Sequence, residues 1–410
     1  MDSIREIYRI GHGPSSSHTM GPARAAAQFS ARHSGAARVI VHLYGALAST
    51  GRGHLTDVVL RETLGAARTT VAWHPGELLP CHTNGMVFEA FDAAGAPLES
   101  WTVYSPGGGA IRDEEHWESA PPRVYPLTCM DDILAWAADE GASFWEFVAE
   151  HEGPAIWDFL TEVWRVMQDA IARGTEAEGR LPGTLNLARK AAAYRIKAAN
   201  SGEYLEESGR IFAYALAVAE ENAAGGRVVT APTCGSCGVV PAVLRFLQDH
   251  YAFSNQRILR ALATAGLIGN LVKENASISG AEVGCQGEVG TACAMAAAAA
   301  AQLLGGSVAQ IEYAAEAGIE HHLGLTCDPV EGYVQIPCIE RNSVAASRAL
   351  QSASFAILSD GRHRISFDEV VATMKDTGAD MQAAYKETSR SGLAKHWHES
   401  EQRTRASTRE

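Results

Sequence analysis

A run of very small side chains constrains this fold more than any other feature of the sequence. Residues 284–301 read GCQGEVGTACAMAAAAAA, a cysteine between glycines followed by a segment that is almost entirely alanine. Alanine is the strongest helix former, and a helix that is apolar on every side has to be buried. Because its side chains are short, other helices can approach it closely. The run therefore predicts a tightly packed helical body with Cys285 at the mouth of a buried helix.

Composition narrows the class of protein. The 410 residues are 46% hydrophobic and 20% charged, an ordinary balance for a globular protein of two or three domains. The formal net charge of −14 argues against a nucleic-acid partner, which would require a basic face. The first residues, MDSIREIYRIGHG, lack an apolar signal segment, and the sequence suggests no membrane partner. We expect a cytoplasmic protein, in which cysteines serve as metal ligands, reactive thiols or buried apolar residues.

The secondary-structure signals change part of the way along the chain. Residues 37–45, ARVIVHLYG, are typical of a strand, residues 53–65 have helical spacing, and residues 86–105 suggest a hairpin about a DAAG turn. Residues 113–127 are acidic and contain prolines, as in a linker. Beyond them the pattern is helical almost throughout, with helix start and stop signals.

These signals predict an α+β protein, in which a small N-terminal α/β sandwich domain is followed by a larger all-α helical domain. The expected boundaries are 1–124 for the first domain, 125–395 for the second and 396–410 for a polar tail.

A hydroxyl-rich segment lies near the beginning of the chain. Residues 11–26, GHGPSSSHTMGPARAA, place three serines, a histidine and a threonine directly before a predicted helix. Free backbone N–H groups at a helix start favour an anion or a carboxylate. A helix cap with spare serines is an equally good interpretation of the segment by itself.

Three histidines occupy predicted loops of the first domain. They are His18, His54 in GRGHLTD, and His82 in CHTNGM. A single loop histidine is usually just exposed, but three of them near the ends of elements favour a site at one edge of the sandwich. Such a site would have a general base that works near neutral pH.

Three cysteines, Cys285, Cys327 and Cys338, each lie in a turn that contains glycine or proline. Three thiolates are the usual protein contribution to a [4Fe–4S] cluster with one open iron. Zinc is an alternative if His321 or His322 supplies a fourth ligand, and idle cysteines are another. Cys234 and Cys237 form a C-x-x-C motif, but the sequence has no second one, so we expect these two to pack in the protein interior.

Taken together, these segments resemble one enzyme family over nearly the whole chain. The chain is similar to the iron–sulfur-dependent L-serine dehydratases, in the form that fuses β-type and α-type parts. The resemblance rests on seven segments in the family's order: IGHGPSSSHTMGPARAA, LYGALASTGRGHLTD, CHTNGM, VYSPGGGAI, EENAAGGRVVTAPT, NASISGAEVGCQGEVGTA and EHHLGLTCDPVEGYVQIPCIERN.

The resemblance implies a lyase that converts L-serine to pyruvate and ammonia at a [4Fe–4S] cluster. It implies that Cys285, Cys327 and Cys338 hold the cluster, and that substrate contacts come from Ser15, Ser16, Ser17, Thr19 and Asn84. We expect His54 to be the base, with His82 or His18 orienting substrate or acting as acid. A site that needs both sets of residues should lie between the domains. We also expect a small-molecule substrate and a homodimer.

Two departures from the family's usual sequence bear on this interpretation. Glu331 and Tyr333 stand in CDPVEGYV, where relatives often have CDPVGG, and we expect them beside the cluster, where they would influence substrate choice. No cysteine follows Cys338, so a tail thiolate is not available to occupy the open iron.

Four alternatives remain open from the sequence. They are the same chemistry on another β-hydroxy amino acid such as threonine, a pyridoxal-phosphate dehydratase that uses Lys273, a zinc-dependent hydrolase, and a non-catalytic amino-acid-binding protein.

Overall fold

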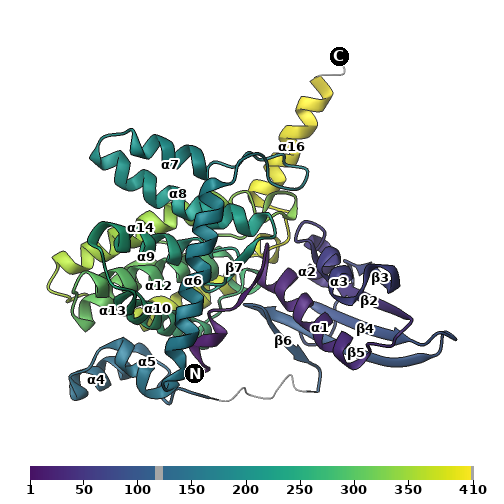
Figure 1. Ribbon diagram of the computed structural model, residues 1–410, viewed down its shortest axis with the longest axis horizontal. Helices are drawn as coiled ribbons and strands as arrows, with labels where there is room; N and C mark the ends of the chain where they lie inside the picture. The colour runs from purple at the N-terminus through teal and green to yellow at the C-terminus, as the bar shows by residue number, and fades with distance from the viewer. Residues whose placement is uncertain (116–122, 408–410) are drawn as a thin grey trace.

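The computed structural model describes residues 1–115 and 123–407. It shows a large helical body and, beside it, a smaller domain built on a sheet (Figure 1). The predicted α+β fold class is confirmed. The predicted linker, 113–127, falls partly on residues 116–122, which lie outside the described residues.

The smaller domain is a mixed sheet covered by helices. Its strand order is β3-β2-β4-β5-β6; β2 and β3 are parallel and the other neighbours antiparallel. The strands are β2 (Arg38–Tyr44), β3 (Thr69–His74), β4 (Gly85–Phe91), β5 (Pro97–Gly107) and β6 (Ala110–Asp113), and the helices are α1 (Gly21–Arg32), α2 (Gly45–Thr50), α3 (Thr56–Leu64) and η3 (Ala66–Arg68).

The sequence explains why this sheet forms. β2 alternates buried Val39, Val41 and Leu43 with partly exposed residues, so one face of the sheet turns toward the helices. Phe29 of α1 and Phe88 of β4 complete this core. The strand predicted at 37–45, the helix at 53–65 and the hairpin at 86–105 are all present.

The helical body is built around the alanine run. Its elements are α4 (Met130–Glu140), α5 (Phe144–Glu152), α6 (Ala155–Glu176), α7 (Ala191–Ala199), α8 (Glu203–Ala223), β7 (Arg227–Val229), α9 (Val239–Tyr251), α10 (Asn255–Asn275), α11 (Gly280–Val283), η4 (Gln286–Gly290), α12 (Thr291–Leu303), α13 (Val308–Glu320), η5 (Val330–Gly332), α14 (Cys338–Leu358), α15 (Phe367–Asp380), η6 (Ala383–Tyr385) and α16 (Gly392–Ser407).

α12 lies among α9, α10, α13 and α14, and its alanines are fully buried. The approach of α13 is very close, because a Cβ added to Gly318 would lie 2.7 Å from the Cα of Ala294. Small side chains on both helices make this spacing possible. The expected tight packing around the alanine run is therefore present.

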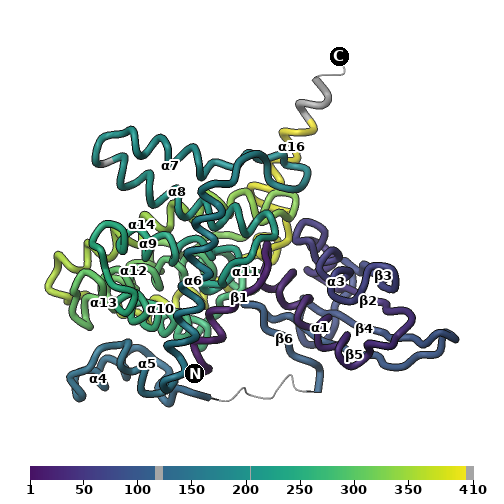
Figure 2. Tube along the Cα trace, viewed as in Figure 1, coloured from purple at the N-terminus to yellow at the C-terminus, as the bar shows by residue number. Residues whose placement is uncertain are grey.

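The first residues of the chain pack differently from the expected first domain, 1–124. Figure 2 shows the N-terminal segment, with η1 (Ile4–Glu6) and β1 (Ile10–His12), running along the helical body. β1 pairs antiparallel with β7, and Met1, Ile4, Ile7 and Tyr8 are buried in the helical core. These side chains are mostly large and apolar, so their burial in the helical core stabilises this route of the chain.

Two further features concern the ends and the surface. The stretch expected as a polar tail, 396–410, is helical as far as Ser407, and residues 408–410 lie outside the described residues. Within the described ranges, every helix is too short or too polar to cross a membrane.

Candidate active site

A small cavity lies where the two domains meet. The smaller domain and its leading segment contribute Pro14, Ser15, Ser16 and His54. The helical body contributes the rest of the lining, namely Gly235, Cys285, Glu288, Val289, Cys327, Pro329, Val334, Cys338 and Glu387. The structure thus brings together residues from sequence segments that are hundreds of positions apart, at the domain junction where we expected the site.

The three cysteines reach this cavity from three separate turns. Cys285 precedes the π-turn η4, which runs directly into α12. Cys327 is fixed by its backbone, since its N–H donates to the Tyr385 carbonyl at 2.8 Å and its carbonyl accepts from the N–H of Glu387 at 2.7 Å. Cys338 is the first residue of α14. All three side chains are buried, so their positions are set by packed elements on every side.

Glu288 lies among these thiols. The Sγ atoms of Cys285 and Cys327 are each 3.9 Å from its Oε2, and the three ligand atoms lie within 4.8 Å of one another. Gly280 leaves room for the Glu288 carboxylate, because a Cβ at this position would lie 2.7 Å from it. Thiols and a carboxylate at this spacing form a potential metal-binding group.

Burial raises the free energy needed to ionise these cysteine thiols. The pKa of Cys327 is raised well above its usual value by a hydrogen bond with Cys285 and by burial. The pKa of Cys338 is raised by burial and by the nearby Cys285. Arg341 is a nearby cation, whose Nη1 donates to the Thr326 carbonyl at 2.7 Å. A bound cation would reverse this cost, because metal binding deprotonates a coordinating thiol.

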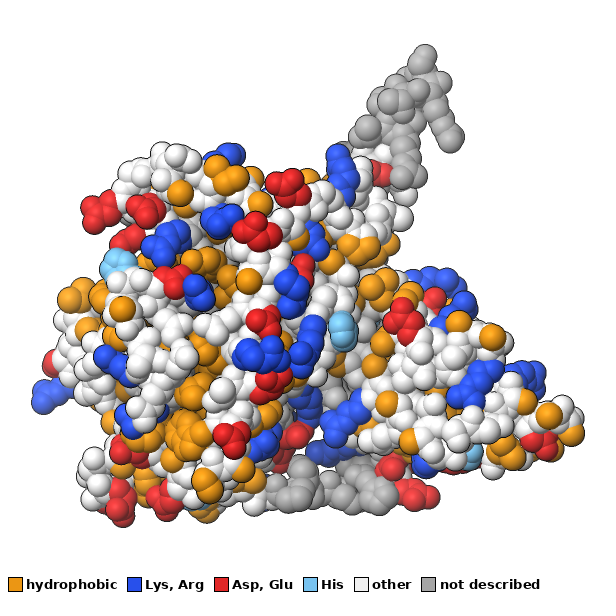
Figure 3. Space-filling view, in the orientation of Figure 1, with side chains coloured by type: hydrophobic (Ala, Val, Ile, Leu, Met, Phe, Trp, Pro, Cys, Tyr) orange, Lys and Arg blue, Asp and Glu red, His pale blue; other side chains and the backbone are white. Residues whose placement is uncertain are grey.

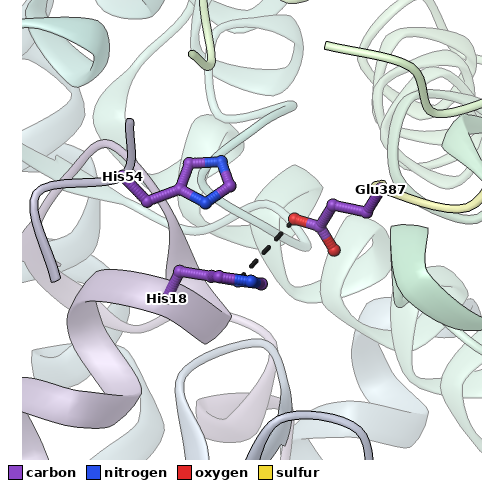
Figure 4. A group of neighbouring side chains, drawn as sticks. All are labelled: His18, His54 and Glu387. Atoms are coloured by element: carbon purple, nitrogen blue, oxygen red, sulfur yellow. Dashed lines mark ion pairs between the residues drawn. The ribbon is translucent and has the colours of Figure 1, made fainter. Parts of the chain in front are cut away.

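Two imidazoles face the thiols from the smaller domain. The rings of His18 and His54 meet edge to face, with centroids 4.5 Å apart, and His18 Nδ1 lies 3.8 Å from Glu387 Oε1 (Figure 4). Both histidines are completely buried. Neither ring nitrogen of His54 has a hydrogen-bond partner among the described residues, so both remain available to a ligand.

Hydroxyl groups hold these two histidine segments together. His18 is in η2 (Ser16–Met20), and His54 is in the turn between α2 and α3. Thr19 Oγ1 donates to the His54 carbonyl at 2.7 Å, and Thr56 Oγ1 donates to the His18 carbonyl at 2.5 Å. The rings are thus positioned by reciprocal bonds between side chain and backbone.

Burial also sets the protonation of these rings. Burial is the main cause that lowers the pKa of His18 to about 4, and His82 contributes to this shift. Burial lowers the pKa of His54 well below the ordinary value, with His18 adding to the effect. Both imidazoles are therefore neutral near pH 7, the state in which a histidine accepts a proton.

The serine segment both caps a helix and lines the cavity, as the two interpretations of its sequence suggested. The hydroxyl of Ser15 accepts from the backbone N–H of His18 at 3.1 Å and caps η2. Ser15 and Ser16 also line the cavity. Ser17 Oγ lies 2.8 Å from His18 Nδ1, so it contacts the histidine instead of the cavity.

His82 and Asn84 lie outside the cavity lining. His82 Nε2 is 3.5 Å from Glu282 Oε1, and its Nδ1 accepts from the backbone N–H of Asn84 at 3.0 Å. Asn84 is buried and donates to the Ser105 carbonyl at 3.2 Å. His82 is close enough to His18 to contribute to the lowering of its pKa.

Three site residues were missed from the sequence. Glu288 stands three residues after Cys285 and Arg341 three residues after Cys338, so their spacing along one helical turn could have indicated them. Glu387 has no comparable spacing from a cysteine in the sequence. It comes from an irregular segment with a left-handed backbone (φ 58° at Glu387 and 56° at Ser389), and burial raises its carboxyl pKa, together with Glu288 and Cys285.

The residues considered for other chemistries lie elsewhere. Cys234 and Cys237 are buried in an apolar cluster with Met20, as expected for packing residues. His321 is outside the cavity lining, and His322 Nδ1 bonds to the Gly318 carbonyl at 2.7 Å. Lys273 is in α10 and its Nζ is 2.8 Å from Asp2, so it is not the loop lysine that a pyridoxal-phosphate enzyme would use.

Glu331 and Tyr333, the residues of the first family departure, are not among the residues that line the cavity. Glu331 and Tyr333 both contact Thr184, with the Thr184 N–H donating to the Tyr333 hydroxyl at 3.4 Å. It is Val334, the next residue, that lines the cavity. Glu331 and Tyr333 therefore contact the loop after α6 and are not among the residues that line the cavity with the cysteines, and their influence on substrate choice stays a prediction.

Comparison with known proteins gives consistent matches over nearly the whole chain. The family model described as serine dehydratase alpha chain matches residues 108–394, and that described as serine dehydratase beta chain matches residues 3–68 and 61–116. An L-serine dehydratase from Streptomyces coelicolor is 44% identical, over 96% of this chain and 98% of the relative. L-serine dehydratase 1 from Escherichia coli is 43% identical (96% and 99%), and an L-serine dehydratase from Helicobacter pylori is 37% identical (96% and 98%).

Proposed function

The chain belongs to the serine dehydratase family, with the alpha-chain and beta-chain parts fused, and from this we propose that it deaminates L-serine to pyruvate and ammonia. The observation that carries the proposal is the convergence at one cavity of three buried thiols from the helical body and a buried neutral imidazole from the smaller domain. Neither domain by itself supplies both the thiols and the imidazole that the proposed reaction requires.

The thiols suit an iron–sulfur cluster as the cofactor. Cys285, Cys327 and Cys338 supply three soft sulfur donors in a buried setting, with Arg341 nearby to offset the negative charge of thiolates. When bound through three cysteines, a [4Fe–4S] cluster supplies a Lewis-acidic iron that draws electron density from a substrate's carboxylate and β-hydroxyl. We therefore propose that these three residues hold it.

His54 is the proposed base for the α-proton of serine. Its ring lines the cavity, is neutral at pH 7, and has two nitrogens without partners among the described residues. Taking the α-proton at one ring nitrogen makes the electron pair available to expel the β-hydroxyl. His54 then holds one positive charge until that proton is released.

His18 and Glu387 are placed to supply the other proton. His18 Nδ1 lies between the Ser17 hydroxyl at 2.8 Å and the Glu387 carboxyl at 3.8 Å. Burial raises the Glu387 pKa, so this carboxyl holds a proton that the leaving hydroxyl needs to depart as water. Ser15 and Ser16, on the same wall, are positioned to bind the substrate carboxylate.

The overall reaction then balances without an oxidant or reductant. Loss of one proton and one hydroxide from serine gives water and aminoacrylate. Aminoacrylate rearranges to an imine, and one water hydrolyses it to pyruvate and ammonia.

The test is to purify the enzyme anaerobically, count iron and acid-labile sulfide, and assay pyruvate from L-serine, L-threonine and D-serine. We expect about four iron and four sulfide per chain and release of pyruvate from L-serine. Zinc without sulfide, or serine binding without pyruvate, would contradict the proposal. Faster turnover of L-threonine would keep the chemistry and change the substrate.

A further inference from the structure

A second cavity, of about 350 Å³, lies between the two domains and shares no lining residue with the first. Its walls come from the N-terminal segment, α1, the β5–β6 hairpin and the stretch from the end of α10 to α11. Blue side chains gather in the hollow between the helical body and the smaller domain (Figure 3). Sites of this volume at domain junctions commonly bind small molecules.

The charged side chains in this cavity are mainly cations. Arg9, Arg24, Arg112 and Lys273 all line it. They lie close enough to oppose one another's charge. Burial lowers the pKa of Arg9 to about 10, and Arg24 contributes to this. Burial also lowers the pKa of Lys273, with Arg9 and Arg112 adding to the effect against the opposing Asp2.

The carboxylates of the cavity are already engaged. Glu6 pairs with Arg9, and Asp2 lies 2.8 Å from Lys273 Nζ. Glu282 bonds with Ser277 and lies 3.5 Å from His82 Nε2. Arg24, by contrast, makes no hydrogen bond or ion pair with the described residues around it. Arg112 also lines the cavity and already has an interaction within the protein. A bound anion would therefore relieve repulsion among groups that the fold holds together.

The hairpin that borders the cavity leaves room for a ligand. Gly107, Gly108 and Gly109 have φ values of 141°, 56° and 78°, which favour glycine. A Cβ on Gly108 would approach Arg9 Nη1 to 3.4 Å, so a side chain there would crowd the cation. Arg9 Nη1 donates to the Gly108 carbonyl, so the glycine hairpin holds this guanidinium in the cavity wall.

We propose that this cavity binds a small organic oxyanion, carrying a phosphate or carboxylate group held between Arg24, Arg112 and Arg9. The binding itself does not depend on the proposed serine chemistry. One consequence does: Glu282 is in the cavity wall, contacts His82 and lies three residues before Cys285, so an occupant would act on His82, which in turn influences His18. An occupied cavity should then change the KM for serine.

The test is calorimetric titration of the cofactor-loaded enzyme with inorganic phosphate and with succinate, at constant ionic strength set with chloride. We expect saturable binding at one site, at least about tenfold weaker in Arg24→Gln/Arg112→Gln. Arg61→Gln, which removes an exposed cation from α3 in the same domain, should bind like the parent protein. The stronger of the two probes identifies whether phosphate or carboxylate is preferred.

Three results would overturn the proposal. They are absence of saturable binding, equal affinity in all three proteins, and displacement of phosphate by L-serine in simple competition, which would place the anion in the first cavity. The single variant Arg24→Gln, at an exposed position, covers the case in which the double variant fails to fold. Because binding is measured without turnover, a failure of the serine chemistry would not be mistaken for a failure of this site.

Discussion

The two walls of the active-site cavity are built from different kinds of structure. The helical wall places Cys285 and Cys338 at helix starts and Cys327 in a β-bridge to Lys386, and α12, whose alanines are fully buried, follows Cys285. The wall from the smaller domain places its imidazoles on a π-turn and a short interhelical turn, braced by hydroxyl-to-carbonyl bonds. The comparison suggests a division of labour, in which the helical wall fixes a cofactor and the other wall handles protons.

The largest effect should come from removing a thiol of the helical wall. We expect Cys327→Ala to lose iron and sulfide together with activity, since several kcal/mol of transition-state stabilisation, on the order of 10³-fold in rate, would go with the metal. Iron content and visible absorbance measure this directly. Cys293→Ala is the matched control, because Cys293 is equally buried in α12 but does not line the cavity. Equal iron in both variants would refute the division.

His54→Ala examines the opposite wall. Loss of a general base should lower kcat by about 10²- to 10⁴-fold, while iron content and absorbance stay at the parent level. His33→Ala, which alters a histidine of the same domain that contacts Glu99, should leave both unchanged. A parallel fall in absorbance and kcat would mean that His54 supports the structure of the site.

Packing behind the helical wall predicts a stability difference. A methyl group on Gly318 would lie 2.7 Å from the backbone of Ala294, so Gly318→Ala should destabilise the protein by about 1–3 kcal/mol. Gly35→Ala, in the smaller domain, meets nothing within 4 Å and should stay within about 0.5 kcal/mol of the parent. Chemical unfolding measures both. Equal effects would show that the spacing of α12 and α13 adapts to larger side chains.

The two regions should also contribute to the pH dependence of folding stability with opposite signs, an effect smaller than those above. Burial, with Glu320 and Glu312, raises the pKa of Glu316 on α13 to about 8. The folded state therefore binds more protons than the unfolded state between the unfolded pKa near 4.5 and pH 8, and stability falls as the pH rises through this window. A lowered histidine pKa, as at His18, has the opposite effect. The unfolded state then binds more protons than the folded state, so stability falls as the pH falls from about 6.5 to about 4.

Glu316→Gln removes the first of these titrations. We expect the variant to be more stable than the parent by about 1–2 kcal/mol at pH 8 and indistinguishable from it at pH 5. Thermal unfolding at the two pH values measures the difference. Glu320→Gln, at the exposed end of the same helix, should show a much smaller change. A constant difference across this range would show that Glu316 does not titrate there.

How much of this could be predicted from sequence depends on the range of the interactions involved. The strand at 37–45 and the buried alanine helix follow from local patterns, so both were predictable. Cys285, Cys327 and Cys338 were identifiable as a group because the glycine- and proline-containing turns and the family resemblance marked all three. The orientation of Glu331 was not predictable, because a single left-handed residue in η5 determines it.

Long-range packing explains the remaining differences. Glu387 enters the cavity because its backbone N–H bonds to the carbonyl of Cys327, a contact with no trace in the local sequence. The first ten residues read as part of the smaller domain because they precede it, yet their apolar side chains fill the helical core. Neither contact has a periodicity that a sequence window could detect.

The route of the chain at its beginning has a consequence for the fused architecture. The carbonyl of Met1 accepts from the N–H groups of Val124 and Tyr125 at 2.8 and 3.1 Å, and β1 completes a two-stranded ladder with β7. The smaller domain is thus inserted between two segments of the chain that both pack on the helical body. Expressed as two polypeptides, the halves would still bind by strand complementation. Each large apolar side chain of residues 1–8 would contribute about 1.5–3 kcal/mol to that association.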